Sequence, residues 1–250
     1  MPPETERTLR DLDLGAHLRD RGTRQRFVTR MFDIIAPRYD RFTRIFSFWM
    51  DAGWKAELLE PLSLVPQGAR VLDLACGTGD LALAAADRAA ASRVTGLDAS
   101  REMTRLASRR SHERVSFAVA DMMQLPVPDN SIQAITAGYG FRNVPDHRVA
   151  IREAARALST GGLLLVLDFY RPRNTLWRTV FLSYLRASGN LVGWLWHGEA
   201  IVYGYIAPSI SAYVSVEQFS ADLEAAGFEM VWVRRKLLGG IALHAARKGS

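Results

Sequence analysis

The chain has 250 residues, of which 48% are hydrophobic and 23% are charged. These fractions are ordinary for a soluble globular protein and exclude wholesale disorder and fibrous repeats, while the length suits one large α/β domain. The single cysteine, Cys76, excludes an intrachain disulfide and a cysteine cluster for zinc. We therefore expect a packed thiol, no bound metal and a reducing, cytoplasmic setting.

The net charge of +6 raises the question of a nucleic-acid partner. The arginines are scattered over predicted helices rather than gathered into a tail, so no such partner is expected. No uninterrupted apolar run reaches the roughly 18 residues that span a bilayer, and the N-terminus has no apolar core of the signal-peptide type. We expect a protein that is neither secreted nor integral to a membrane.

The first 64 residues divide into two parts. Residues 1–24 are polar and charged, which predicts a flexible N-terminal arm. Residues 25–64 follow a helical pattern that is interrupted at Pro37 and around 47–53, which predicts a cap of two or three short helices. The basic stretch 19–44 carries apolar residues at helical spacing. Together with the aromatic residues of 177–205, it predicts reversible contact with an anionic bilayer; packing of both segments on the sheet and on each other is the other interpretation.

From residue 70 the pattern changes to short apolar runs that alternate with helical stretches. This alternation predicts a parallel, doubly wound α/β sheet with helices on both faces. The predicted strands are 71–75, 93–97, 115–120, 132–137 and 163–169. One predicted helix follows the first strand and ends near residue 91, and two others span 100–110 and 147–158.

The last third of the chain interrupts this alternation and then closes the sheet. Residues 171–213 are rich in Trp and Tyr among aliphatics and glycines, which predicts an inserted helical cover on the acceptor side. A helix over 216–226 and strands over 229–236 and 241–246 follow. We expect a mostly parallel, seven-stranded sheet that ends in an antiparallel hairpin.

Glycines stand where the first predicted strand meets a helix. Gly77-Thr78-Gly79 lets a ligand approach the backbone closely and directs free N–H groups at it. A nicotinamide fingerprint needs a further glycine, where this chain has Ala82. Asp73, inside the strand, would repel a pyrophosphate and would hold the amino-acid end of S-adenosylmethionine.

Two more acids follow the next two predicted strands. Asp98 lies at a distance suited to a carboxylate that accepts both ribose hydroxyls. Asp121 can accept the adenine amino group while Met122 packs against the ring. Acids at three successive strand ends favour a nucleoside without phosphates, so we predict S-adenosylmethionine and disfavour a nicotinamide oxidoreductase.

The glycine loop and three further segments resemble known sequences. Residues 71–80, with 96–100 and Met103, resemble the class I methyltransferases. Residues 139–144 (Tyr-Gly-Phe-Arg-Asn-Val) resemble the Phe-Gly-Leu-Arg-Asn-Val signature of the ubiquinone/menaquinone C-methyltransferase family. Similarity to that family extends over about residues 25–246, including Tyr39-Asp40, Ser47-Phe48, Trp54-Lys55 and the segment 239–244.

This resemblance implies a Rossmann-like class I methyltransferase domain over residues 25–250, which converts S-adenosylmethionine to S-adenosylhomocysteine. The implied acceptor is a prenylated quinol of the demethylmenaquinol or ubiquinone-precursor type, methylated at a ring carbon. The cofactor-binding residues expected from the loop, the acids and the resemblance are Asp73, Ala75, Gly77, Thr78, Gly79, Asp98, Ala99, Met103, Asp121, Met122 and Tyr139.

Carbon methylation of a quinol requires loss of a phenol proton, and phenols ionise near pH ~10. Arg142, just beyond the fourth predicted strand, is predicted to pair with the developing phenolate or to activate a water that Asn143 orients. A surface ion pair between Arg142 and Asp146 is the other interpretation. His147 and His244 are candidate bases or packing residues.

The acceptor pocket is predicted from aromatic residues in the two cover segments. These candidates are Tyr39, Trp49, Tyr203 and Tyr205. The oligomeric state stays open, a homodimer included, as does peripheral contact with the inner face of a membrane.

Departures from the family pattern bear on the acceptor. Phe42-Thr43 stands where the family has Met-Asn, and Trp49–Ala52 where it has Gly-x-His-Arg, in the region of its acceptor-side helices. Residues 159–162 replace Lys-Pro-Gly-Gly by another turn. A methyltransferase of another hydrophobic natural product therefore stays open. A nucleic-acid methyltransferase is disfavoured because no Asn/Asp-Pro-Pro-Tyr/Phe motif is present.

Overall fold

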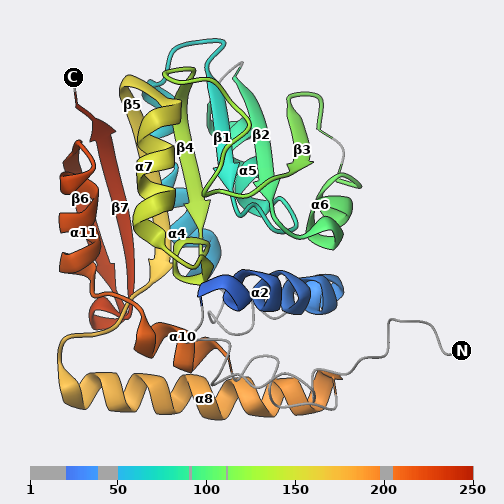
Figure 1. The fold of residues 1–250 in the computed structure, drawn as a ribbon, viewed down its shortest axis with the longest axis vertical. Helices are drawn as coiled ribbons and strands as arrows, with labels where there is room; N and C mark the ends of the chain where they lie inside the picture. The colour runs from blue at the N-terminus through green and yellow to red at the C-terminus, as the bar shows by residue number, and fades with distance from the viewer. Residues whose placement is uncertain (1–20, 39–49, 90–91, 111, 198–204, 250) are drawn as a thin grey trace, which may run out of the picture.

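The computed structural model describes residues 21–38, 50–89, 92–110, 112–197 and 205–249. Its centre is one seven-stranded sheet with the strand order β3-β2-β1-β4-β5-β7-β6 (Figure 1). The first five strands pair in parallel, and β7 runs antiparallel to both β5 and β6. The predicted fold class is confirmed. The strands are β1 (Arg70–Leu74), β2 (Arg93–Asp98), β3 (Val115–Val119), β4 (Ile132–Gly138), β5 (Leu158–Phe169), β6 (Phe228–Lys236) and β7 (Ile241–Lys248).

Helices cover both faces of the sheet. One face packs on α4 (Met50–Leu58) and α5 (Asp80–Arg88), and the other on α7 (His147–Ala157) and α11 (Val216–Ala225). Neighbouring residues of a strand point to opposite faces, so Val71 packs with the first pair and Leu72 with the second. The buried apolar strands therefore need helices on both sides, as parallel sheets do.

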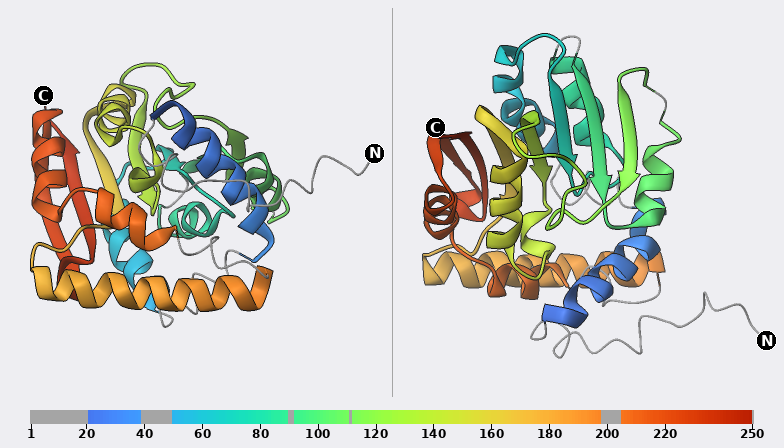
Figure 2. Two further views of the ribbon diagram at one scale, coloured as in Figure 1. Left: turned by 60° about the horizontal axis from the view of Figure 1, so that its bottom comes forward. Right: turned by 45° about the horizontal axis from the view of Figure 1, so that its top comes forward.

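A third group of helices lies across the carboxyl ends of the parallel strands. Helix α2 (Arg21–Ile35) runs closest to the strand ends, and α8 (Thr175–His197) is the outermost helix, with α10 (Ile206–Ala212) beside it (Figures 1 and 2). The remaining described helical elements are short: α6 (Arg101–Ala107), η3 (Ala36–Arg38), η4 (Glu60–Leu64), η5 (Phe141–Asn143) and η6 (Leu237–Gly239).

The predicted element bounds differ from the structure by one to five residues. The largest difference is at β5, which begins at Leu158 rather than at residue 163, because Leu158 is already extended and pairs with Ile132 before Gly161 turns the chain at φ +75°. Helix α6 is shorter than the predicted 100–110. The Ser100 side chain caps its first turn, and beyond Ala107 the N–H groups of Arg109 and Arg110 bond to carbonyls three residues back instead of four.

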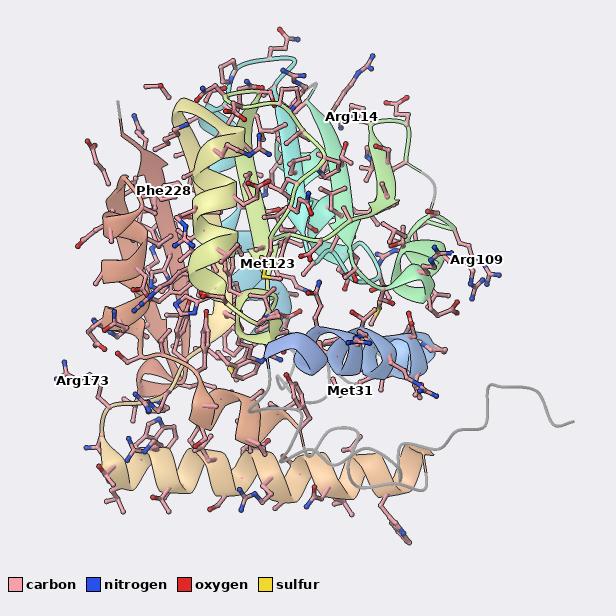
Figure 3. The ribbon with its side chains drawn as sticks, in the orientation of Figure 1. Met31, Arg109, Arg114, Met123, Arg173 and Phe228 are labelled. Carbon is pink, nitrogen blue, oxygen red and sulfur yellow. The ribbon has the colours of Figure 1, made fainter. Side chains whose placement is uncertain are left out.

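The N-terminal expectations are only partly within the described residues. Helix α2 begins at Arg21, inside the predicted arm of residues 1–24, and residues 1–20 lie outside the described part. Three apolar residues of α2 face inward: Val28, Met31 and Ile35 are buried, whereas Ile34 is 38% exposed, and Figure 3 shows Met31 on the side towards α8. These three residues of the amphipathic pattern serve packing.

His244 lies in the core on β7, where Nδ1 is 3.2 Å from the Tyr170 hydroxyl, so it is not placed as a base for an acceptor. Burial lowers its pKa to about 4, from an ordinary value of 6.5. The unfolded chain thus binds the proton more readily between pH 6.5 and 4. His244 therefore contributes stability that is complete above pH 6.5 and is lost as the pH falls towards 4.

We expect this residue alone to lower the free energy of unfolding by about 3 kcal/mol between pH 7 and pH 4. Urea unfolding at a series of pH values measures the loss. His244→Gln, which does not titrate in this range, should flatten the profile, and equal profiles for the two proteins would contradict the assignment.

Candidate functional site

A cavity of about 670 Å³, which includes space open to solvent, lies at the carboxyl ends of the parallel strands. Side chains of α2 form the wall opposite the strand ends. The structure brings nine of the sequence-predicted residues to this lining: Ala75, Gly77, Asp98, Ala99, Met103, Asp121, Met122, Tyr139 and Asn143.

The loop after β1 is shaped for close approach to a ligand. Ala75, Gly77 and Gly79 all have positive φ, at 51°, 54° and 90°. A Cβ built on Gly140 would lie 2.7 Å from the Cβ of Ala75, so the Gly140 backbone packs directly against the Ala75 side chain. Any residue larger than glycine at position 140 would therefore collide with the loop after β1.

Asp98 anchors this loop from the end of β2. One carboxylate oxygen accepts the Gly77 N–H and the other accepts the Ser100 N–H, both at 2.8 Å. Burial raises the pKa of Asp98, and the two backbone N–H groups oppose that rise. Each oxygen keeps a further lone pair, so the carboxylate can also accept the two hydroxyls of a ribose.

Asp121 is held from both sides of the cavity. Its Oδ1 accepts the Met123 N–H at 2.8 Å, and its Oδ2 accepts from Gln25 Nε2 at 2.7 Å. Gln25 comes from α2, 96 residues earlier in the chain. Gln25 is not among the predicted site residues, because a polar residue in a basic, helical stretch carries no local signal of a site.

Asp73 lies away from the cavity. On β1 it shares the face of Val71, so its side chain points between β4 and α5, where Oδ1 accepts from Thr136 Oγ1 at 2.7 Å. Burial raises its pKa to about 7. Asp73 therefore supports the loop from behind. Thr78 and Gly79 also lie outside the lining and start helix α5.

The Arg142–Asn143 turn, η5, follows β4 at the edge of the cavity. Arg142 is buried, and its Nη1 donates to Asp168 Oδ1 and to the Tyr139 carbonyl, each at 2.9 Å. Its backbone N–H also donates to Asp168, at 3.1 Å. The buried partner is Asp168, whereas the Asp146 side chain caps α7. The alternative interpretation, a surface ion pair between Arg142 and Asp146, is therefore wrong.

Asn143 is the member of this turn that reaches the cavity. Its Nδ2 donates to the Tyr139 carbonyl at 2.9 Å, which fixes the amide. Its buried Oδ1 has no hydrogen-bond partner among the described residues. A buried acceptor without a partner is costly, so this oxygen is suited to a hydrogen bond from a ligand or a water.

Tyr139 adds a second polar connection at the same edge. Its hydroxyl donates to Asp51 Oδ1 at 2.8 Å, and Asp51 also pairs with Lys55 at 2.6 Å. Asp51 is buried at the start of α4, 88 residues before Tyr139 in the chain. Asp51 belongs to the segment in which this chain departs from the signature that it resembles, and its contact with Tyr139 joins that segment to the turn after β4.

The other predicted residues lie elsewhere or outside the described part. Tyr205 is buried against Val28 and Met31 of α2, so it supports the wall of the cavity and does not line it. Tyr39, Trp49 and Tyr203 lie outside the described residues. His147 binds Asp222 of α11 at 2.7 Å, away from the lining. Among the described residues, no group of acids, histidines or cysteine could hold a metal ion.

The antiparallel β7 inserted beside β5, and the cavity above the β1 loop, define the class I fold of S-adenosylmethionine-dependent methyltransferases. Solved structures share this fold. The chain matches the Haloferax volcanii complex of the Trm112 methyltransferase activator and a putative methyltransferase with a TM-score of 0.64 at 19% identity, covering 88% of this chain and 98% of that one. A geranyl diphosphate methyltransferase in complex with GPP and sinefungin matches with a TM-score of 0.61 at 15% identity, covering 79% and 77%.

Sequence comparison identifies the family. The ubiE/COQ5 methyltransferase family matches residues 20–248, so the chain belongs to this family. A demethylmenaquinone methyltransferase of Thermus thermophilus is 38% identical over 219 residues, covering 86% of this chain and 98% of that protein. A ubiquinone/menaquinone biosynthesis C-methyltransferase of Geotalea daltonii is 33% identical over 227 residues, covering 88% and 96%. The chain is an S-adenosylmethionine-dependent methyltransferase.

Proposed function

We propose that this enzyme transfers a methyl group from S-adenosylmethionine to a ring carbon of a prenylated quinol. The observation that carries the proposal is that Asn143, whose buried Oδ1 has no hydrogen-bond partner among the described residues, lines the same cavity as Asp98 and Asp121. Two carboxylates can hold a nucleoside at one end while the amide meets an acceptor hydroxyl at the other. The names of the curated relatives support a quinol as that acceptor.

The cavity fits the cofactor by the chemistry of its wall. Asp98 would accept the ribose hydroxyls and Asp121 the adenine amino group, with Met122 against the ring. The Gly77 loop leaves room for the amino-acid end, because its backbone faces the cavity without side chains. The cofactor supplies a methyl group on a positively charged sulfur.

The protein must stabilise the acceptor as a phenolate, because the ionised oxygen makes the neighbouring ring carbon nucleophilic. Asn143 Oδ1 would accept a hydrogen bond from the phenol or from a water that removes its proton. Arg142, an unsuitable base because guanidinium stays protonated, would supply positive charge behind the amide. Asp168 and the Tyr139 carbonyl hold Arg142 in that position.

The test is methylation by the purified protein of a chemically reduced demethylmenaquinol with a short prenyl tail. The product is separated by chromatography, and its mass spectrum and proton NMR distinguish a new carbon–methyl bond from an oxygen–methyl bond. We expect carbon methylation that depends on the quinol being reduced. Methylation of soluble phenols but not of quinols would contradict the quinol acceptor and would indicate a natural product as the acceptor.

A further inference from the structure

Helix α8 has an outward-facing apolar stripe in addition to the face that packs inward. Phe181 and Leu185 are buried on the inner face. On the outer side, apolar residues recur at intervals of three, four and seven residues, which places them on one side of a helix. These residues and their exposed fractions are Leu176 (77%), Val180 (52%), Tyr184 (41%), Leu191 (58%) and Trp194 (64%).

The turn between β6 and β7 adds two more leucines at the start of this helix. Leu238 is 78% exposed, and both Leu237 and Leu238 have positive φ, at 47° and 50°. Left-handed backbone is unfavourable for branched side chains, and such positions are usually glycine or asparagine. Trp177 Nε1 donates to the Leu237 carbonyl at 2.9 Å, which joins the turn to α8.

The charge of this segment has one sign. The sequence from Arg171 to His197 contains no acidic residue and four arginines. Arg171, Arg173 and Arg186 are exposed, and Figure 3 shows Arg173 beside the start of α8, directed away from the fold. Exposed leucine and tryptophan among arginines match a layer of apolar chains under anionic headgroups.

The helix is also close to the cavity. Phe181 and Leu185 of α8 pack in one apolar cluster with Met103, and Met103 lines the cavity. The inner face of α8 therefore belongs to the apolar cluster that supports the cavity wall, while its outer face is exposed. Of the residues that the structure describes, none belongs to a helix long and apolar enough to cross a membrane. An interfacial position, parallel to the membrane surface, suits this arrangement.

We propose that the outer face of α8 and the Leu237–Leu238 turn form a docking surface for an anionic lipid bilayer. The proposal rests on the proposed function, because a prenylated quinol stays in the bilayer and its enzyme must reach it there. It assigns the contact to α8 and the β6–β7 turn rather than to α2, of which Val28, Met31 and Ile35 are buried.

The test compares the full chain with two triple variants on vesicles of phosphatidylcholine containing phosphatidylglycerol. One variant places glutamate on the docking surface, as Leu176→Glu, Leu191→Glu and Leu238→Glu. The matched control places glutamate at three exposed apolar positions elsewhere, as Leu64→Glu, Val119→Glu and Val231→Glu. Both variants carry the same change of charge, and circular dichroism and thermal unfolding confirm that each is folded.

We expect the wild type and the control to float with the vesicles. The affinity of the docking-surface variant for the vesicles should be lower by about tenfold or more. With long-tailed quinol in the vesicles, methylation should fall about as much in the docking-surface variant. With a short-tailed quinol in solution, it should stay within about twofold of the wild type, because the cavity is untouched.

Each contrary result identifies what has failed. Equal flotation of the two variants overturns the docking surface, whether or not the quinol is methylated. Normal flotation of wild type without methylation of either quinol leaves the surface standing and contradicts the proposed function. If the wild type does not float and sediments as a dimer that the docking-surface variant abolishes, the surface is an interface between two copies and the proposal is wrong.

Discussion

Replacing Arg142 by alanine is expected to lower the turnover of a quinol acceptor by about 100-fold or more while sparing cofactor affinity. The change removes the positive charge behind Asn143 and the hydrogen bond to the Tyr139 carbonyl. It also leaves Asp168 buried without its cationic partner, although burial already raises the pKa of that carboxyl. Removing one partner of a buried ion pair costs about 3–5 kcal/mol, so the free energy of unfolding should fall as well.

Turnover with a short-tailed quinol and calorimetry with S-adenosylhomocysteine measure the two functional effects, at a temperature where the variant is shown to be folded. Arg234→Ala is the matched control. Arg234 is 40% exposed and pairs with Glu57 and Glu60, so its loss should change stability little and leave turnover unchanged. Turnover of Arg142→Ala within about threefold of the wild type would contradict the charge-stabilising role.

The sheet could be predicted from the sequence because its signals are local. Strands β1, β2, β4 and β5 are apolar runs that are each followed by a turn and a helical pattern, so strand, helix and parallel pairing could be derived together. The start of β5 could not be predicted from the sequence. Residues 158–162 carry a Ser-Thr-Gly-Gly segment that resembles a loop, whereas the pairing of Leu158 with Ile132 is a tertiary contact.

The candidate site divides in the same way. Asp98 and Asp121 could be predicted, because the position of an acid at a strand end decides which edge of the sheet it occupies. The role of Asp73 could not be derived from its position next to the loop, because the alternation of the strand turns its side chain towards Thr136. A shift of one residue along the strand thus decides whether a side chain lines the cavity or supports the loop from the other side.

The missed residues are those whose partners are distant in sequence. Gln25 meets Asp121, and Asp51 meets Tyr139, over separations of 96 and 88 residues. Neither Gln25 nor Asp51 stands out locally, although Asp51 belongs to the segment recognised as departing from the family pattern. Pairing that departure with Tyr139 required the packing of α4 against the sheet, which no local pattern supplies.

Asp98→Ala is expected to weaken binding of S-adenosylmethionine by at least about tenfold, because it removes the acceptor of both ribose hydroxyls. Each hydrogen bond to a charged acceptor contributes roughly 1.5–3 kcal/mol. Asp98 also accepts the Gly77 and Ser100 N–H groups, so alanine leaves two loop amides without their acceptor before any ligand arrives. The variant should therefore lose affinity both through the ribose and through a less ordered loop.

Asp98→Asn separates these two causes. Asparagine keeps one carbonyl oxygen for a loop N–H but offers an NH₂ group, a donor, to the other. Calorimetric affinities for S-adenosylmethionine should therefore rank wild type above Asp98→Asn, and Asp98→Asn above Asp98→Ala. Asp87→Ala, which removes a carboxylate of a 75% exposed side chain on α5, is the control and should bind as the wild type does. An affinity of Asp98→Ala equal to that of the control would remove Asp98 from the cofactor site, because no carboxylate that accepts a ribose can be dispensable for its binding.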